Sequence, residues 1–206
     1  MTGVLTDAPA GRALSELPET VEMILTGHAR WGETAGREGR PADFSGFDLR
    51  SLKGLHHAVL TALIAPGAVF YGLDLTGARL QGAQLEGADL RGCKLTGADL
   101  RGVNLKGAKL ANADLRDVNL GPLLISNDRL LPARLERVDA RYADFRGADL
   151  RQTVLAEADL AFADLTGAKL RATDFRGAIL QGIKLSLDGA VEAIFDETRY
   201  DVAAAG

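Results

Sequence analysis

Residues 95–115, LTGADLRGVNLKGAKLANADL, and residues 144–170, DFRGADLRQTVLAEADLAFADLTGAKL, carry a large apolar residue at every fifth position. From residue 75 to residue 185, 19 of the 23 positions whose number divides by five are Leu, two are Phe, and the others are Ile125 and Ala140. A period of five fits neither the helical period of 3.6 nor the strand period of two. The chain must therefore turn within every repeat.

The other positions of the repeat predict how each turn is built. Two residues before the large apolar position, Ala occupies 13 of the 23 places, and the residue between the two is often charged. A minimal extended segment would point the small and the large residue inward and the charged residue outward. The second residue after the large one is Gly in 11 repeats, and glycine supplies the positive φ that a tight turn requires.

Both stretches resemble the A(D/N)LxG signature of the pentapeptide-repeat family. The resemblance implies an all-β fold, a right-handed quadrilateral β-helix in which four repeats make one coil, so that equivalent residues of successive coils lie 20 positions apart in the sequence. Such a solenoid is stabilised by contacts between neighbouring coils, because no single repeat can bury its apolar face alone.

Charged side chains 20 positions apart support this coil length. Stacking at that spacing places Lys94 between Asp74 and Asp114, and it also pairs Arg79 with Asp99, Asp89 with Lys109 and Asp149 with Lys169. The same rule brings like charges together at Asp139 with Asp159 and at Asp144 with Asp164, for which the sequence offers no explanation.

The pattern divides the chain into three parts. Residues 1–41 form an N-terminal segment with a capping helix over residues 18–31, in which Pro18 takes the first helical position and His28 packs against the coil. Residues 42–185 form the β-helix, whose first coil contains a slip of one residue between Leu49 and Leu55. Residues 186–206 form a C-terminal cap and tail, with the apolar residues Val191, Ile194, Phe195 and Tyr200. These residues would close the coil or pair two chains, and the family resemblance makes a C-terminal dimer an expectation.

Residues 121–132, GPLLISNDRLLP, interrupt the repeat. They keep its numerical phase, but they put Asp128 at an inward position and carry Pro122 and Pro132 at their ends. A buried unpaired carboxylate is costly, so we expect about 5 to 10 residues to leave the coil as an exposed loop. Asn127, Asp128 and Arg129 are then candidate contacts for a partner.

Tyr142 and Phe162 replace the usual corner glycine and lie 20 positions apart, so they should stack on one face of the coil. Neighbouring exposed aromatic rings are typical of a contact patch. Alternatively, they are two corner residues that cover nearby backbone, and the sequence does not choose between these interpretations.

Composition favours binding over catalysis. His28, His56 and His57 lie outside the regular repeats, no Cys/His cluster has zinc-ligand spacing, and the carboxylates recur at outward positions, so we expect no enzyme activity, no metal and no cofactor. The single cysteine, Cys93, occupies a small inward position, where an inert core thiol is favoured over a nucleophile. Without a secretory signal or an apolar run long enough to span a membrane, we expect a cytoplasmic protein.

Two functions remain open. The first is a protein-interaction module or scaffold that uses the charged walls, the 121–132 loop and the Tyr142 and Phe162 column. The second follows from the resemblance, because some members of the family resemble B-DNA in shape and charge and protect a type II topoisomerase such as gyrase. Those members are strongly acidic, whereas residues 71–185 carry 17 basic and 15 acidic side chains. Mixed charges and the lack of a basic stripe argue against direct binding to nucleic acid.

Overall fold

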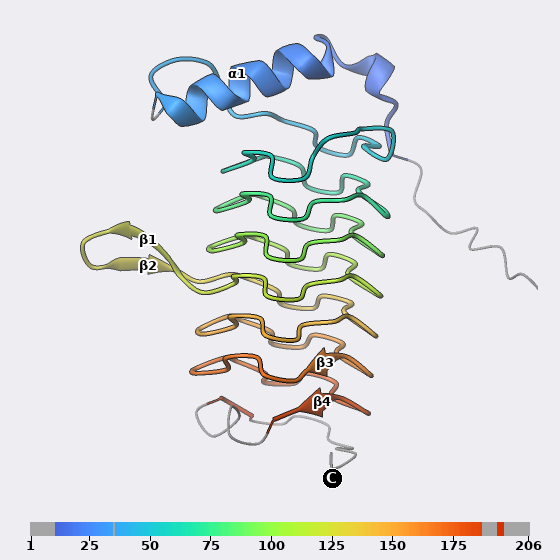
Figure 1. The fold of residues 1–206 in the computed structure, drawn as a ribbon, viewed down its shortest axis with the longest axis vertical. Coiled ribbons are helices and arrows are strands. Elements are labelled where there is room, and N and C mark those ends of the chain that lie inside the picture. Colours follow the sequence, from blue (N-terminus) through green and yellow to red (C-terminus); the bar gives the residue numbers. More distant parts are fainter. Residues whose placement is uncertain (1–10, 35, 187–192, 196–206) are drawn as a thin grey trace, which may run out of the picture.

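A stack of similar coils makes up most of the molecule (Figure 1). The structure is a computed structural model and describes residues 11–34, 36–186 and 193–195. Parallel bridges join residues 20 positions apart, for example Asp74 to Lys94 and Lys94 to Asp114, which confirms the coil length and the alternating charge ladder expected there. Where two such bridges adjoin they form short strands, and β3 (Asp164–Leu165) pairs with β4 (Lys184–Leu185) in parallel.

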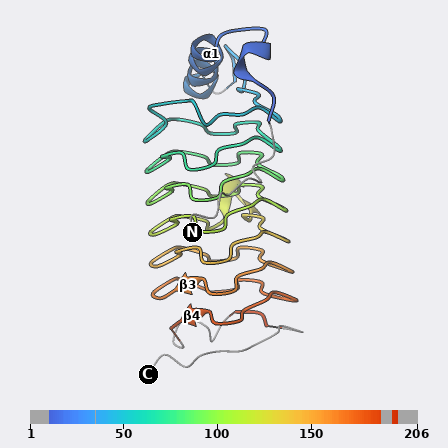
Figure 2. The same cartoon turned by 90° about the vertical axis from the view of Figure 1, so that its right-hand side faces the viewer.

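The interior of the coils is a column of leucines and small residues. Leu95, Leu100, Leu105 and Leu110 belong to one coil, and each is at most 1% exposed. Alanines such as Ala98 and Ala108 are completely buried between them. A turn follows each leucine, and its corner residue has a positive φ, as at Gly97, whose N–H donates to the Arg116 carbonyl of the next coil at 2.9 Å. The corner therefore both turns the chain from one wall to the next and connects successive coils, which lie one above another in Figure 2.

Helix α1 (Val21–Glu33) lies across the N-terminal end of the stack and follows a short 3₁₀ helix (Leu14–Glu16). The helix begins three residues later than Pro18, because the Thr20 hydroxyl accepts the Met23 N–H and caps the first turn. Ile24 and His28 are its buried residues, and the Ala42 N–H donates to His28 Nδ1 at 3.0 Å. Burial lowers the pKa of His28, so the neutral ring that accepts this bond is favoured.

The first coil contains the extra residue that the sequence indicates. Asp43 bridges Ile64 and Asp48 bridges Val69, each 21 positions apart, whereas the bridge from Val59 to Arg79 spans 20. The additional residue lies between Leu49 and Leu55, where Gly54 adopts a φ of 73°. The coil register that places every later side chain is established after this point.

A β-hairpin projects from the middle of the stack (Figure 1). It consists of β1 (Leu123–Ser126) and β2 (Arg129–Leu131), which are antiparallel, with Leu123 opposite Leu131 and Leu124 opposite Leu130. Bridges that cross the hairpin in sequence, such as Asn104 to Arg134 and Asp114 to Asp144, join residues 30 positions apart instead of 20. The hairpin thus adds two repeats to this coil without disturbing the phase of the leucines.

At the other end of the stack, one further segment continues the coil. The Ile194 N–H donates to the Thr173 carbonyl at 2.8 Å, and the Phe195 ring stacks on Phe175 with centroids 5.2 Å apart. These two residues cover part of the last coil. Val191 and Tyr200, which are predicted from the sequence to belong to the same cap, lie outside the described residues.

Candidate functional site

The hairpin carries three of the candidate contact residues. Asn127 and Asp128 form its turn, Arg129 begins β2, and all three are exposed. Asp128 is therefore not buried in the coil, where an unpaired carboxylate would be costly. The excursion is an ordered pair of strands, whereas the sequence indicated only an exposed loop.

A glycine at a coil corner allows the hairpin to pack against the stack. A Cβ on Gly102 would lie 2.8 Å from Leu123 Cβ and 3.1 Å from Leu131 Cδ2, so only a residue without a side chain leaves room for both leucines. Because side chains alternate along a strand, Leu124 and Leu130 point to the opposite face of the hairpin. Leu124, Ile125 and Leu130 are 62%, 45% and 48% exposed, which makes the hairpin an apolar arm in contact with solvent.

Tyr142 and Phe162 form the stack that their spacing predicts. Their ring centroids lie 5.1 Å apart with an angle of 9° between the planes, and the residues are 57% and 47% exposed. The Phe162 ring lies over Gly182, since a Cβ there would be 2.6 Å from Phe162 Cδ1. The glycine thus lets the aromatic column lie flat against the next coil.

The structure does not bring the hairpin and the aromatic stack together. The hairpin leaves the stack at the column of corners to which Gly102 and Gln152 belong. Tyr142 is a corner residue two repeats before Gln152, which is half a coil away. The two groups therefore lie on opposite sides of the stack. A single small ligand could not contact both, but two partners, or one that surrounds the coil, could.

One wall of the coil differs from the others in charge. Repeats that bridge to one another in successive coils form one column, and each coil has four such columns. For residues 71 to 186, we define the wall of a column as the residues directly before and directly after each of its large inward residues. Three walls carry equal numbers of basic and acidic side chains, and the fourth carries an excess of three basic ones. We call this fourth wall the basic wall, and its charged residues are Arg79, Asp99, Arg101, Asp149, Arg151, Lys169 and Arg171.

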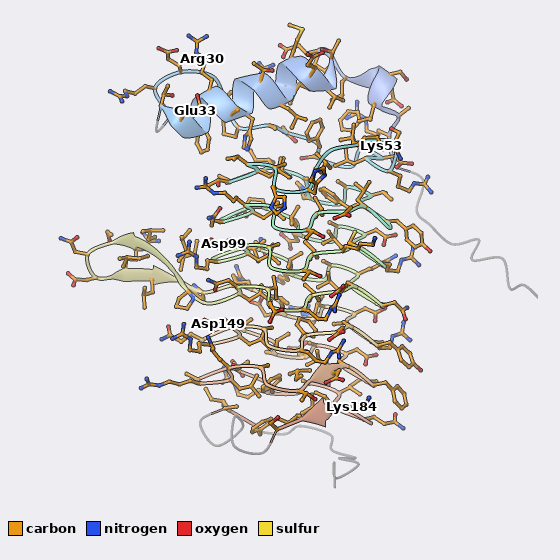
Figure 3. All side chains as sticks on the ribbon, in the orientation of Figure 1. Arg30, Glu33, Lys53, Asp99, Asp149 and Lys184 are labelled. Carbon is orange, nitrogen blue, oxygen red and sulfur yellow. The ribbon has the colours of Figure 1, made fainter. Side chains whose placement is uncertain are left out.

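The 20-residue spacing does not reveal this wall in the sequence. Arg101 and Arg151 are 50 positions apart, which is not a multiple of 20, so no basic stripe is apparent. With the two inserted repeats of the hairpin removed, the two arginines fall in one column, and the bridges Asp99 to Asn119, Asn119 to Asp149 and Asp149 to Lys169 connect that column. Realigning the repeats across the interruption would have revealed it. Asp99 and Asp149, labelled in Figure 3, lie on the side from which the hairpin projects.

Most outward carboxylates on the walls are paired with an arginine two residues later. Eight such Asp–Arg pairs have N–O distances between 2.5 and 2.8 Å; their aspartates are Asp48, Asp89, Asp99, Asp114, Asp139, Asp144, Asp149 and Asp174. Hydrogen bonds from Arg116 lower the pKa of the Asp114 carboxyl from 3.8 to about 2. In each pair the guanidinium lies against the carboxylate and neutralises its charge.

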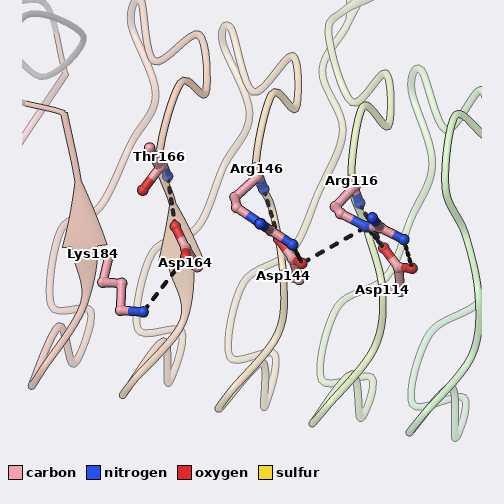
Figure 4. Close-up of polar contacts among 7 residues, drawn as sticks. All are labelled: Asp114, Arg116, Asp144, Arg146, Asp164, Thr166 and Lys184. Atoms are coloured by element: carbon pink, nitrogen blue, oxygen red, sulfur yellow. Dashed lines mark hydrogen bonds and ion pairs between the residues drawn. The ribbon is translucent and has the colours of Figure 1, made fainter.

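The same arginines explain the like-charge neighbours that the sequence left open. Arg141 Nε lies 2.8 Å from Asp139 and 3.6 Å from Asp159 in the next coil. On another wall, Arg116 lies 3.8 Å from Asp144, and Lys184 lies 3.8 Å from Asp164 (Figure 4). A cation therefore lies close to Asp159, Asp144 and Asp164, and it reduces the repulsion between each of these carboxylates and the aspartate of the neighbouring coil.

Groups that could support catalysis are placed as core or surface residues. Cys93 is fully buried, its thiol lies 3.1 Å from the Phe70 carbonyl, and burial raises its pKa to about 12, so the thiolate is disfavoured. Within the described ranges, no three His, Cys, Asp or Glu side chains are grouped to hold a metal ion. Across the same ranges, the helices are too short or too polar to cross a bilayer.

Bridges every 20 positions, with four five-residue turns in each coil around a leucine column, define a pentapeptide-repeat solenoid. The family model for pentapeptide repeats matches residues 55–92, 83–121, 133–171 and 155–187, which is more than half of the chain, and the chain belongs to this family. The gap between the second and third matches coincides with the hairpin. No curated protein sequence matches the chain.

Solved structures match the chain with different TM-scores. A trypsin-treated form of QnrB1, a plasmid-mediated fluoroquinolone resistance protein, is 21% identical with a TM-score of 0.51, over 73% of this chain and 78% of that one. HetL, a pentapeptide repeat protein involved in heterocyst differentiation regulation in the cyanobacterium Nostoc, is 26% identical with a TM-score of 0.28, over 75% and 81%. The fold is thus the right-handed β-helix of pentapeptide-repeat proteins.

Proposed function

We propose that this chain is a non-catalytic interaction module or scaffold that binds another protein in the cytoplasm. The observation that carries the proposal is the hairpin, which extends Leu124, Ile125 and Leu130 into solvent. Complete burial of a leucine or isoleucine side chain contributes about 1.5 to 3 kcal/mol, and roughly half of that is forgone for each of these half-exposed residues. A partner that covers them would recover that free energy.

The aromatic stack is a second candidate contact. Tyr142 and Phe162 present ring edges to solvent at the opposite side of the coil. Stacked aromatic side chains offer a large contact area with little loss of side-chain freedom on binding. Pairing of two copies through the C-terminal end is also part of the proposal, and the mass of the protein in solution tests it.

Capture from a lysate of the source cells, with quantitative mass spectrometry, tests the proposal. We expect Leu124→Ser with Leu130→Ser to reduce the recovery of a specific protein by at least about tenfold, because two buried leucines contribute more than the roughly 1.4 kcal/mol that a tenfold change requires. Ile179→Ser is the matched control, since Ile179 is an exposed apolar residue on the coil wall. Equal recovery with both variants, or no specific protein, would contradict the proposal.

Tyr142→Gly with Phe162→Gly tests the aromatic stack in the same experiment. Glycine is the appropriate replacement because both residues have a positive φ and Gly92 and Gly182 occupy other corners of the same column. The rings are then removed without backbone strain. Loss of a different protein from that lost with the hairpin variant would indicate two separate partners.

Protection of a type II topoisomerase, such as gyrase, by DNA mimicry is the second candidate. The fold similarity to QnrB1 favours it. Electrostatics favour it less, because three walls are neutral, one is basic, and eight outward carboxylates are already paired with arginine. A supercoiling assay with fluoroquinolone-poisoned gyrase tests it, and rescue that depends on the amount of added protein would support it.

A further inference from the structure

We propose that the basic wall beside the hairpin binds an acidic segment of a partner protein, with carboxylates held by Arg101 and Arg151. This inference rests on the proposed interaction function and specifies the chemistry of the partner.

The wall contains a hollow next to the hairpin. It has a volume of about 490 Å³, and Arg101, Asn119, Gly121, Pro122, Arg151 and Arg171 are among its lining residues. Gly121 is the residue equivalent to Arg101 and Arg151 in the coil that lies between theirs. The chain leaves the coil and enters the hairpin directly after Gly121. The absence of a side chain at Gly121 leaves space between two guanidinium groups.

Both arginines are held in place and retain unused donors. Arg101 donates from Nε and Nη2 to Asp99, and Arg151 donates from the same atoms to Asp149, at distances of 2.5 to 3.1 Å. The Nη1 group of each has no hydrogen-bond partner among the residues that the structure describes. A guanidinium that is already oriented loses little freedom when it binds a further carboxylate.

The spacing of the arginines fits an extended peptide. Arg101 and Arg151 are two coils apart, which at the usual distance between strands is about 10 Å. Alternate side chains of an extended segment lie about 7 Å apart on one face, and flexible Asp or Glu side chains adjust for the difference. Such a segment could place one carboxylate near each arginine.

Charge selects an acidic ligand for this wall and not for the others. The other three walls have no net charge, so an approaching acidic segment is attracted mainly to the basic wall. The hairpin begins at Pro122 on the edge of the hollow, and its exposed leucines offer contacts to apolar residues of the same segment.

A protein segment fits these features better than a nucleic acid does. The phosphates of a nucleic acid offer no apolar groups to Leu124 and Leu130, whereas an acidic protein segment can carry apolar side chains beside its carboxylates. Asp99 and Asp149 also lie among the arginines and limit the positive potential to short distances.

Fluorescence anisotropy tests the inference with a short labelled peptide in which Glu alternates with Leu, and with a matched peptide of Gln and Leu. We expect the wild-type protein to bind the Glu peptide at least about tenfold more tightly than the Gln peptide. Arg101→Gln with Arg151→Gln should abolish this preference. Arg116→Gln with Arg146→Gln should retain it, since these arginines form the same kind of Asp–Arg pair on a neutral wall.

Gly121→Leu provides a second test that leaves the charge unchanged. Its φ is not in the left-handed region, and its Cβ would lie 3.2 Å from Asn119 Oδ1, so a side chain can be accommodated with a small adjustment. The leucine should fill the hollow and weaken binding of the Glu peptide by at least about fivefold, while thermal unfolding monitored by circular dichroism confirms that the coil is intact.

Several results would overturn the inference. The first is that both double arginine variants lose binding of the Glu peptide equally, and the second is that the wild-type protein does not prefer the Glu peptide over the Gln peptide. The third is that a labelled single-stranded oligonucleotide binds more tightly than the Glu peptide and that its binding depends on Arg101 and Arg151. If lysate capture depends on Leu124 and Leu130 but is unchanged in Arg101→Gln with Arg151→Gln, the inference fails and the proposed interaction function stands.

Discussion

The coils before the hairpin and those after it have the same interior, but corner residues with side chains are more frequent after it. Leu100 and Leu160, one from each part, are 1% and 0% exposed. At the corners, every residue from Gly72 to Gly107 in steps of five is glycine with φ between 63° and 69°. From residue 137 to residue 182, six of the ten corner residues have a side chain at a similar φ: Arg137, Tyr142, Gln152, Glu157, Phe162 and Ala172.

The corner residues that carry a side chain are the positions at which the backbone is strained, because their φ is positive. A left-handed backbone costs a residue with a side chain roughly 1 to 2 kcal/mol relative to its preferred conformation. Just before the hairpin, Asn112 and Asp117 already adopt this backbone, with φ of 59° and 55°. After it, the same cost places further side chains at corners, including the aromatic pair and the ion pair of Arg137 with Glu157 at 3.5 Å. Strain that persists at exposed positions is typical of residues kept for what they contact.

Leucine substitutions should confirm that the two interiors are equivalent. We expect Leu100→Ala and Leu160→Ala each to reduce the free energy of unfolding by about 2 to 5 kcal/mol, because each leaves a cavity in the same leucine column. Denaturant titration measures the loss, and hydrogen exchange shows whether it spreads to neighbouring coils, as expected for a solenoid. A loss several times larger on one side of the hairpin would show that the two parts differ inside as well.

Exchanging corner residues should alter stability in opposite directions in the two parts. Gly92→Ala should destabilise the protein by about 1 kcal/mol through its φ of 64° alone, since no atom lies within 4 Å of the added Cβ. Ala172→Gly removes strain at a φ of 57°, which stabilises the folded protein, but it also adds chain entropy to the unfolded state, which offsets part of that gain. The net effect should be neutral or stabilising by up to about 1 kcal/mol. Thermal melts of both variants compare the two effects. A clear destabilisation by Ala172→Gly would mean that its methyl group makes a contact that outweighs the strain.

The interior could be predicted from the sequence, because each buried position repeats with a period of five and each inward side chain has one role. The exposed surface was harder to predict. Tyr142 and Phe162 could be paired because no insertion lies between them, whereas Arg101 and Arg151 could not, because the two inserted repeats displace the column.

The 20-residue spacing of stacked residues also does not predict hydrogen bonds between side chains. That rule compares residues 20 positions apart, but the partner of Asp139 is Arg141 in the same coil. The sequence also did not predict that residues 123–131 form a hairpin. Leu123 and Leu131 pack against the coil only because Gly102, which is distant in the sequence, leaves space for them.

The smallest expected effect concerns the charge ladders. In the earlier coils opposite charges alternate, whereas after the hairpin Asp139 and Asp159 adjoin with Arg141 between them. Arg141→Gln should therefore reduce the free energy of unfolding at pH 7, by less than about 1 kcal/mol because the arginine is half exposed. Lys94→Gln is the control from the earlier coils. Its ammonium group forms no ion pair with a described residue, so a smaller loss is expected.

The pH dependence of this loss distinguishes an ion pair from simple packing. Hydrogen bonds from Arg141 lower the pKa of Asp139 in the folded protein, so the stabilisation is complete above the ordinary pKa of 3.8 and is lost as the pH falls through the lowered value. The difference between wild type and Arg141→Gln should thus remain constant from pH 7 to about pH 5 and shrink below pH 3.8. Denaturant titrations across this range measure it. A difference that persists unchanged at the acidic end would mean that Arg141 stabilises the later coils through the packing of its side chain and not through its charge.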